Sequence, residues 1–208
     1  MTARERVTVA MSRKMDTLDR VPVYPILSGV GRKLIDASYP DWSKDSDICA
    51  EAFVKTTEEF DLDCIVTLID LSVECDAWGQ KIIYPENEAA HPDYSDSVIK
   101  SIEDYAKIEK VDYRNSQRMM MHIDVCKKLV EEKGEDYPII AFVFGPLGTL
   151  SMLRNQQDMY MDLYDDPDAV KGAVGNIAAT LQDYALALCD TGVDAIMWDT
   201  LFSSGSIM

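Results

Sequence analysis

The chain has 208 residues, which is enough for one sizeable domain with a hydrophobic core and short for two. Hydrophobic residues make up 47% and charged residues 27%, a composition typical of folded globular proteins and not of disordered ones. Lysine and arginine total 20 against 37 aspartate and glutamate residues, so the formal net charge is −17. Because this charge repels nucleic-acid backbones and anionic membranes, we expect neither as a partner.

Neither an export signal nor a membrane span is predicted. The longest uncharged stretch, residues 137–153, is interrupted by Pro138, Gly145, Pro146 and Gly148, which indicates a strand and a loop. The first six residues are rich in charge and lack the apolar core of a signal peptide. The five cysteines are odd in number and irregularly spaced, which indicates reduced thiols. We therefore expect a cytoplasmic protein.

The first part of the chain predicts an alternation of helices and strands. Thr2 and Glu5 fit a capping box at the start of the first helix. The continuous apolar run at 64–69 suits a strand that is buried on both faces, as in parallel sheets. The elements predicted here are, in order, a helix from Thr2 to near Lys14, a strand at 21–27, a turn at 28–31, a helix at about 45–61 and a strand at 64–69.

The second part continues the alternation. Gly145 and Pro146 close one strand, and Pro167 stands in the first turn of the last helix, where its missing N–H is tolerated. The elements predicted here are an excursion at 77–85 with Gly79 at a hairpin turn, a polar loop at 86–94, a helix at 114–133, a strand at 139–144, a helix from about 166 to 191, a strand at 195–198 and a small-residue loop at 203–206.

This order of elements predicts an α/β fold with a parallel sheet. Two of the buried strands end in an aspartate, Asp70 and Asp199. Functional residues of parallel α/β folds lie where the strands end, so both aspartates are candidate site residues. Asp63 and Asp194 precede the same two strands and are interpreted as caps or turn formers.

Five motifs in the same order resemble the uroporphyrinogen decarboxylase superfamily. They are Asp19-Arg20-Val21-Pro22-Val23, Asp70-Leu71-Ser72-Val73-Glu74, Phe144-Gly145-Pro146-Leu147-Gly148-Thr149-Leu150, Asp162-Leu163-Tyr164-Asp165-Asp166-Pro167 and Gly192-Val193-Asp194-Ala195-Ile196. The resemblance implies a (β/α)8 TIM barrel, which needs about 250 residues. We therefore expect an incomplete barrel of about the first four βα units, with residues 1–208 as one domain that forms its N-terminal half.

The superfamily has a decarboxylase branch and a branch that moves methyl groups between corrinoid proteins and thiols such as coenzyme M. The decarboxylases carry R-Q-A-G-R after the first strand, where this chain has Ser28-Gly29-Val30-Gly31-Arg32. The tyrosine of the decarboxylases falls near Leu153. Since serine does not replace a bidentate guanidinium, the departure counts against decarboxylation. The motif at 70–74 resembles the methyltransferase branch more closely.

The resemblance and the strand ends together give the candidate site. Asp70 is the candidate catalytic residue. The candidate substrate-binding residues are Arg32, Ser28, Glu74, Ser72, Asp199, Gly145 and Pro146. The alternatives are structural: a hydrogen-bonded acid at 70, 74 or 199, an exposed or ion-paired Arg32, and a tight turn at Gly145 and Pro146.

The resemblance implies zinc, held by an H-x-C pair and a further cysteine, only in a complete member of the methyltransferase branch. His91 is followed two residues later by Asp93 and His122 by Asp124, so no metal site is predicted in this chain. Corrinoid (cobalamin) is the expected methyl carrier. Decarboxylation of a porphyrinogen and a non-catalytic fragment that binds a tetrapyrrole or a partner chain stay open. The expected partners are a corrinoid protein and a second copy or a complementary barrel half.

Overall fold

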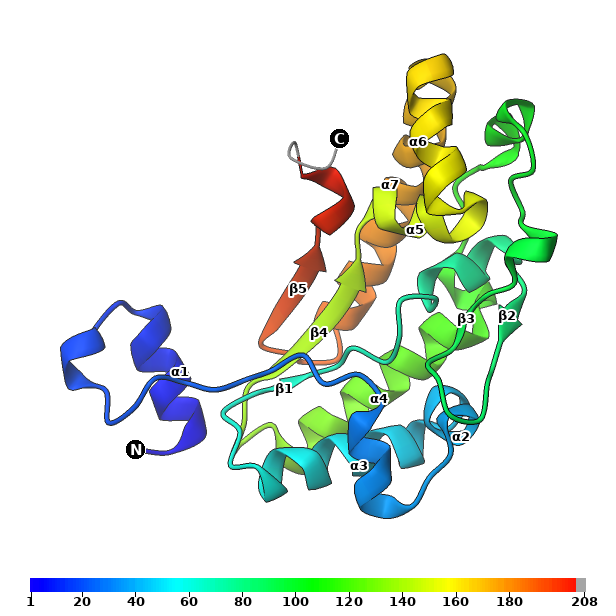
Figure 1. The fold of residues 1–208 in the computed structure, drawn as a ribbon. Helices are drawn as coiled ribbons and strands as arrows, with labels where there is room; N and C mark the ends of the chain where they lie inside the picture. The colour runs from blue at the N-terminus through cyan, green and yellow to red at the C-terminus, as the bar shows by residue number, and fades with distance from the viewer. Residues whose placement is uncertain (205–208) are drawn as a thin grey trace.

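The computed structural model describes residues 1–204 and contains a three-stranded parallel sheet in the order β1-β4-β5 (Figure 1). Its strands are β1 (Ile65–Val66), β4 (Ile139–Phe144) and β5 (Ala195–Asp199). The register aligns Ile65 with Ile139, and Phe144 with Asp199. Because both pairings are parallel, the carboxyl ends of the strands lie at the same edge of the sheet. The α/β class with a parallel sheet is confirmed. Of the loop predicted at 203–206, residues 205 and 206 lie outside the described residues.

The strand predicted at 21–27 is wrong. The segment runs extended beside β1, where the Asp63 N–H donates to the Val23 carbonyl at 2.8 Å, but it forms no strand. Pro22 and Pro25 have no N–H to give to a ladder, which explains the failure. The sheet of residues 1–204 thus has three paired strands, and the count of about four βα units stays a prediction.

The predicted helices are present, with shifts at their ends. Thr2 and Glu5 form the expected capping box of α1. Three further helices were not predicted, and the one at 146–154 begins directly at Pro146, whose fixed φ suits a first turn. The helices are α1 (Ala3–Met11), α2 (Tyr39–Lys44), α3 (Ser46–Glu59), α4 (Gln117–Lys133), α5 (Pro146–Arg154), α6 (Gln156–Asp165) and α7 (Pro167–Cys189).

A small antiparallel hairpin stands apart from the main sheet. It pairs β2 (Ile82–Ile83) with β3 (His91–Pro92). The hairpin turn predicted at Gly79 is wrong, because Gly79 instead ends the 3-10 helix Glu74–Trp78 with a φ of 79°. The left-handed conformation favours glycine at this position. The connection between the two strands is the polar segment 84–90.

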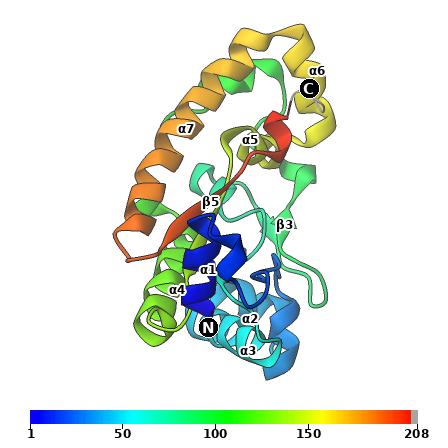
Figure 2. The same cartoon turned by 90° about the vertical axis from the view of Figure 1, so that its left-hand side faces the viewer.

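The core lies between the sheet and three helices. Ile65, Ala141 and Val143 face α3, α4 and α7, whose apolar faces complete the main cluster. Phe142 and Phe144 point to the opposite face, where a smaller cluster forms. Figure 2 shows α7 running from the level of the sheet to α6. Within the described part of the chain, no helix is both long and apolar enough to cross a membrane. The cytoplasmic location stays a prediction.

The helix α1 lies near the amino ends of the strands (Figures 1 and 2), and arginines of this first segment form ion pairs there. Arg4 pairs with Asp194 at 2.6 Å, and Arg6 pairs with Asp63 at 2.5 Å. Arg20 reaches the second oxygen of Asp63, also at 2.5 Å. The two aspartates interpreted as caps or turn formers therefore have structural roles, as the anchors of these ion pairs.

Candidate functional site

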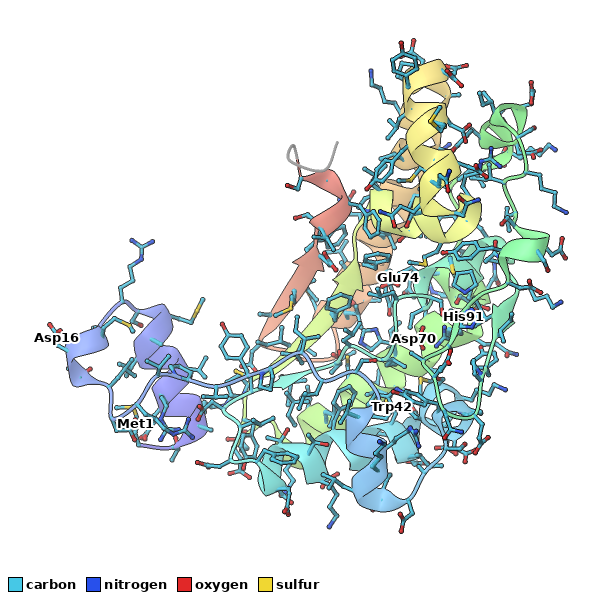
Figure 3. All side chains as sticks on the ribbon, in the orientation of Figure 1. Met1, Asp16, Trp42, Asp70, Glu74 and His91 are labelled. Carbon is cyan, nitrogen blue, oxygen red and sulfur yellow. The ribbon has the colours of Figure 1, made fainter. Side chains whose placement is uncertain are left out.

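A cavity of about 500 Å³ lies at the carboxyl ends of the strands, bounded by the β2–β3 hairpin and α5. Figure 3 shows Asp70 and His91 close together on this side of the molecule, far from Met1 and Asp16. The cavity brings together four of the predicted site residues, Ser28, Asp70, Ser72 and Asp199. Its other lining residues are Ile26, Leu68, Leu71, Ala89, Ala90, His91, Tyr94, Phe142 and Met152.

Asp70 is held by donors of its own chain. Arg118, from the first turn of α4, donates to Oδ1 at 3.0 Å and to Oδ2 at 2.5 Å. The N–H and hydroxyl of Ser72 donate to Oδ1 at 2.9 and 2.6 Å. Both side chains of the ion pair are buried, with 2% of Asp70 and 5% of Arg118 exposed. Burial disfavours the charged guanidinium, but the Asp70 carboxylate outweighs it and holds the Arg118 pKa above its ordinary value.

Arg118 is a site residue that the sequence analysis missed. A signal exists, because Arg118 and His122 are one helical turn apart and lie next to the apolar stripe that begins at Met119. Polar residues at that spacing on a buried helix face need partners. The sequence does not say which acid serves as the partner of Arg118.

Glu74 lies behind the cavity wall and is not among its lining residues. Its side chain is buried, and Oε1 accepts a hydrogen bond of 2.9 Å from the Phe144 N–H at the end of β4. Oε2 has no hydrogen-bond partner among the described residues. Burial raises the Glu74 pKa to about 8, so this carboxyl group holds a proton at neutral pH.

Gly145 and Pro146 also lie outside the cavity lining. The Gly145 N–H donates to the Asp199 carbonyl at 2.9 Å, and a Cβ at position 145 would lie 2.3 Å from that oxygen. Glycine is therefore required for the close approach of β4 and β5, while Pro146 starts α5. The Asp199 side chain accepts from the Leu201 N–H at 2.8 Å and still lines the cavity.

Arg32 is not part of the cavity that contains Asp70. Its Nη1 donates to the Ala37 carbonyl at 2.7 Å, and its guanidinium lies 4.0 Å from the centre of the Tyr39 ring. It lines a separate hollow with Asp41 and Glu86. Ser28, by contrast, donates to the Ile69 carbonyl at 2.9 Å and faces the cavity. The structure thus separates the two residues taken from the 28–32 segment.

The two histidines have different environments. His91 is exposed at the cavity, a position that the sequence analysis did not predict. His122 is buried, with Nε2 2.6 Å from the Thr67 hydroxyl and Nδ1 2.5 Å from the Tyr184 hydroxyl. Burial lowers the His122 pKa to about 4, which keeps the imidazole neutral. Residues 1–204 hold no group of three histidine, cysteine or acidic side chains placed to bind a metal ion.

Comparisons with known proteins agree with the five sequence motifs. The sequence profile of the family described as Uroporphyrinogen decarboxylase matches residues 2–208. A methyltransferase from Methanosarcina mazei has a similar structure, with a TM-score of 0.73 and 18% sequence identity. The similarity covers 94% of this chain and 58% of the methyltransferase. No curated protein matched the chain. Because the profile spans nearly the whole sequence, the chain belongs to the uroporphyrinogen decarboxylase family.

Proposed function

We propose that the chain contributes to methyl transfer between a corrinoid protein and a thiol or a similar acceptor. The observation that carries the proposal is the lining of the cavity, which is mostly apolar, contains Asp70 and Asp199, and has no lysine or arginine from the described residues. A porphyrinogen with several carboxylates would need cationic partners there. Arg118 is bound to Asp70, and Arg32 lies in another hollow, so neither is placed to supply them.

Decarboxylation of a porphyrinogen is the alternative, supported by the family description and by Asp70 at the cavity. In that chemistry Asp70 would accept hydrogen bonds from pyrrole N–H groups. Its Oδ1 already accepts three hydrogen bonds, while Oδ2 accepts one from Arg118 and keeps capacity for another. The geometry leaves Asp70 room for one such contact.

The zinc of the methyltransferase branch does not fit the described residues. Both ring nitrogens of His122 are engaged, and no third ligand accompanies His91. When bound, zinc activates a thiol by lowering its pKa. The chain spans 58% of the similar methyltransferase. We therefore propose that any zinc ligands come from outside residues 1–204.

Ligand binding at the cavity tests the choice between the two activities. We expect methylcobalamin to bind saturably in an absorbance titration, and more tightly than uroporphyrin, a stable polycarboxylate. Met152→Trp, which fills the cavity, should weaken methylcobalamin binding by about tenfold or more. Met161→Trp is the matched control, because Met161 is 58% exposed on α6, and it should leave binding unchanged.

Other results of this titration would contradict methyl transfer. Tighter binding of uroporphyrin, lost in Met152→Trp and kept in Met161→Trp, would favour the decarboxylase. If neither compound binds, the result would favour the alternative hypothesis of a non-catalytic fragment or subunit that binds a partner chain.

The outer edge of β5 supports a partner that supplies further strands. In the sheet order β1-β4-β5, β5 pairs on one side only within the described residues. Such an edge is open to pairing with another chain. We propose a second copy or a complementary barrel half as the partner, and expect light scattering on the purified chain to find a dimer or a larger assembly. A monomer at all concentrations, with a cooperative melt, would contradict self-association.

A further inference from the structure

Glu74 connects two structural elements that each supply a wall of the cavity. It begins the 3-10 helix that follows the Asp70–Ser72 segment, and its carboxyl group accepts from the Phe144 N–H at the end of β4. Figure 3 shows Glu74 beside Asp70. A single buried side chain therefore joins the loop after β1 to the end of β4.

The end of β4 in turn fixes the position of Asp199. The Gly145 N–H donates to the Asp199 carbonyl at 2.9 Å, at a separation too short to admit a Cβ. Phe144 also packs against Phe202, just beyond Asp199, with their ring centres 5.7 Å apart and their planes nearly perpendicular. A displacement of the Phe144 N–H would therefore move the part of the cavity that contains Asp199.

No free cation faces the Glu74 carboxyl group from the elements packed against it within residues 1–204. The charged or titratable groups near Glu74 are Asp70 in the loop after β1, Arg118 on α4, Tyr184 on α7, and Cys75 and Asp76 on its own 3-10 helix. Arg118 is engaged by Asp70, and Tyr184 by His122. Arg154, the one charged residue of α5, pairs with Asp162.

We propose that Glu74, in its protonated form, is a positioning residue that keeps the two polar walls of the cavity, Asp70–Ser72 and Asp199, at a fixed spacing. Loss of the proton would leave a buried anion with one unpartnered oxygen beside the Asp70 carboxylate. The hydrogen bond from the Phe144 N–H favours the charged form, but burial outweighs it, so we expect the ionised side chain to turn toward water, give up that hydrogen bond and let the two walls separate. The proposal stands whichever ligand the cavity accepts.

The raised pKa of Glu74 sets the sign of the effect on stability. In the unfolded chain this carboxyl loses its proton near pH 4.5, whereas in the folded chain it keeps the proton up to about pH 8. Between these values the folded state binds more protons, so the free energy of unfolding falls as the pH rises. The contribution is fully present below the unfolded value and is lost as the pH rises through about 8.

The spectrum of Trp198 tests the proposal without knowledge of the ligand. Trp198 pairs with Val143 across the sheet, and its Nε1 lies 3.5 Å from the position that a Cβ at Gly145 would take. In protein labelled with 5-fluorotryptophan, Trp198→Phe identifies the Trp198 resonance. We expect this resonance to shift in one transition centred near pH 8 in the unmodified chain.

Glu74→Gln should abolish the transition, because the amide keeps an acceptor for the Phe144 N–H and cannot ionise. It should also remove the fall in the free energy of unfolding between about pH 4.5 and 8, as measured by urea denaturation. Glu88→Gln is the matched control, since it makes the same glutamate-to-glutamine exchange at an exposed position, and it should keep the transition. A Trp198 resonance that stays fixed through about pH 10 in the unmodified chain, or a transition that persists in Glu74→Gln, would overturn the proposal.

Discussion

Replacing Arg118 with methionine is expected to lower the free energy of unfolding by about 3–5 kcal/mol. Asp70 would then be a buried carboxylate without a cation, since Arg118 is the residue that reaches both of its oxygens. Ser72 would still donate to Oδ1, but two neutral donors do not replace a bidentate guanidinium. Urea denaturation followed by circular dichroism measures the loss.

The double variant Asp70→Asn with Arg118→Met separates loss of the charge pair from loss of packing. Removing both charges leaves no buried ion without a partner, so most of the lost stability should return. A double variant as unstable as Arg118→Met would show that the guanidinium acts through its packing. It would contradict the assignment of Asp70 and Arg118 as one unit.

Replacing Asp63 with asparagine should lower the free energy of unfolding by a similar amount, about 3–5 kcal/mol. Asp63 is fully buried and accepts from Arg6, Arg20 and the Val23 N–H. Without that charge, the buried Arg6 keeps Asp19 as its one anionic partner among residues 1–204. The effect should be local as well, with α1 and the following segment released from the strands. Limited proteolysis should then cut between α1 and Asp19 before the rest of the chain unfolds.

Asp61→Asn supplies the control for this second experiment. Asp61 pairs with the same Arg20 at 3.0 Å, but its side chain is 92% exposed. Exposed ion pairs contribute little to stability, so Asp61→Asn should change the free energy of unfolding by no more than about 0.5 kcal/mol. The protease pattern should stay unaltered. Equal effects at positions 61 and 63 would mean that burial is not what makes Asp63 an anchor.

The fold could be predicted where a local pattern alone decides the structure. The continuous apolar run 139–144 forms β4, and the capping box of Thr2 and Glu5 starts α1. The pattern failed at 21–27, where β-forming residues lie beside β1 but Pro22 and Pro25 lack the N–H groups that a ladder requires. The helix α5 was missed because Gly145 and Pro146 end a strand and begin a helix equally well.

The candidate site could be predicted only in part. The rule that function lies at the carboxyl ends of strands selected Asp70 and Asp199, and both line one cavity in the structure. It could not reveal Arg118, because the partner of a buried acid is decided by how a distant helix packs. Arg32 was predicted as a site residue from the family resemblance of segment 28–32. In the structure its guanidinium packs on the Tyr39 ring instead. Whether the predicted residues act on a substrate stays a prediction.

The anchoring of α1 has a consequence for the order of folding. Arg4 and its partner Asp194 are 190 positions apart in the chain. The helix α1 therefore cannot reach its complete docking site until the segment leading into β5 has emerged. Closing so long a loop is entropically slow, and proteins with distant contacts fold more slowly than those with local ones. Among residues 1–204, we therefore expect α1 to be one of the last helices to dock completely, although it comes first in sequence.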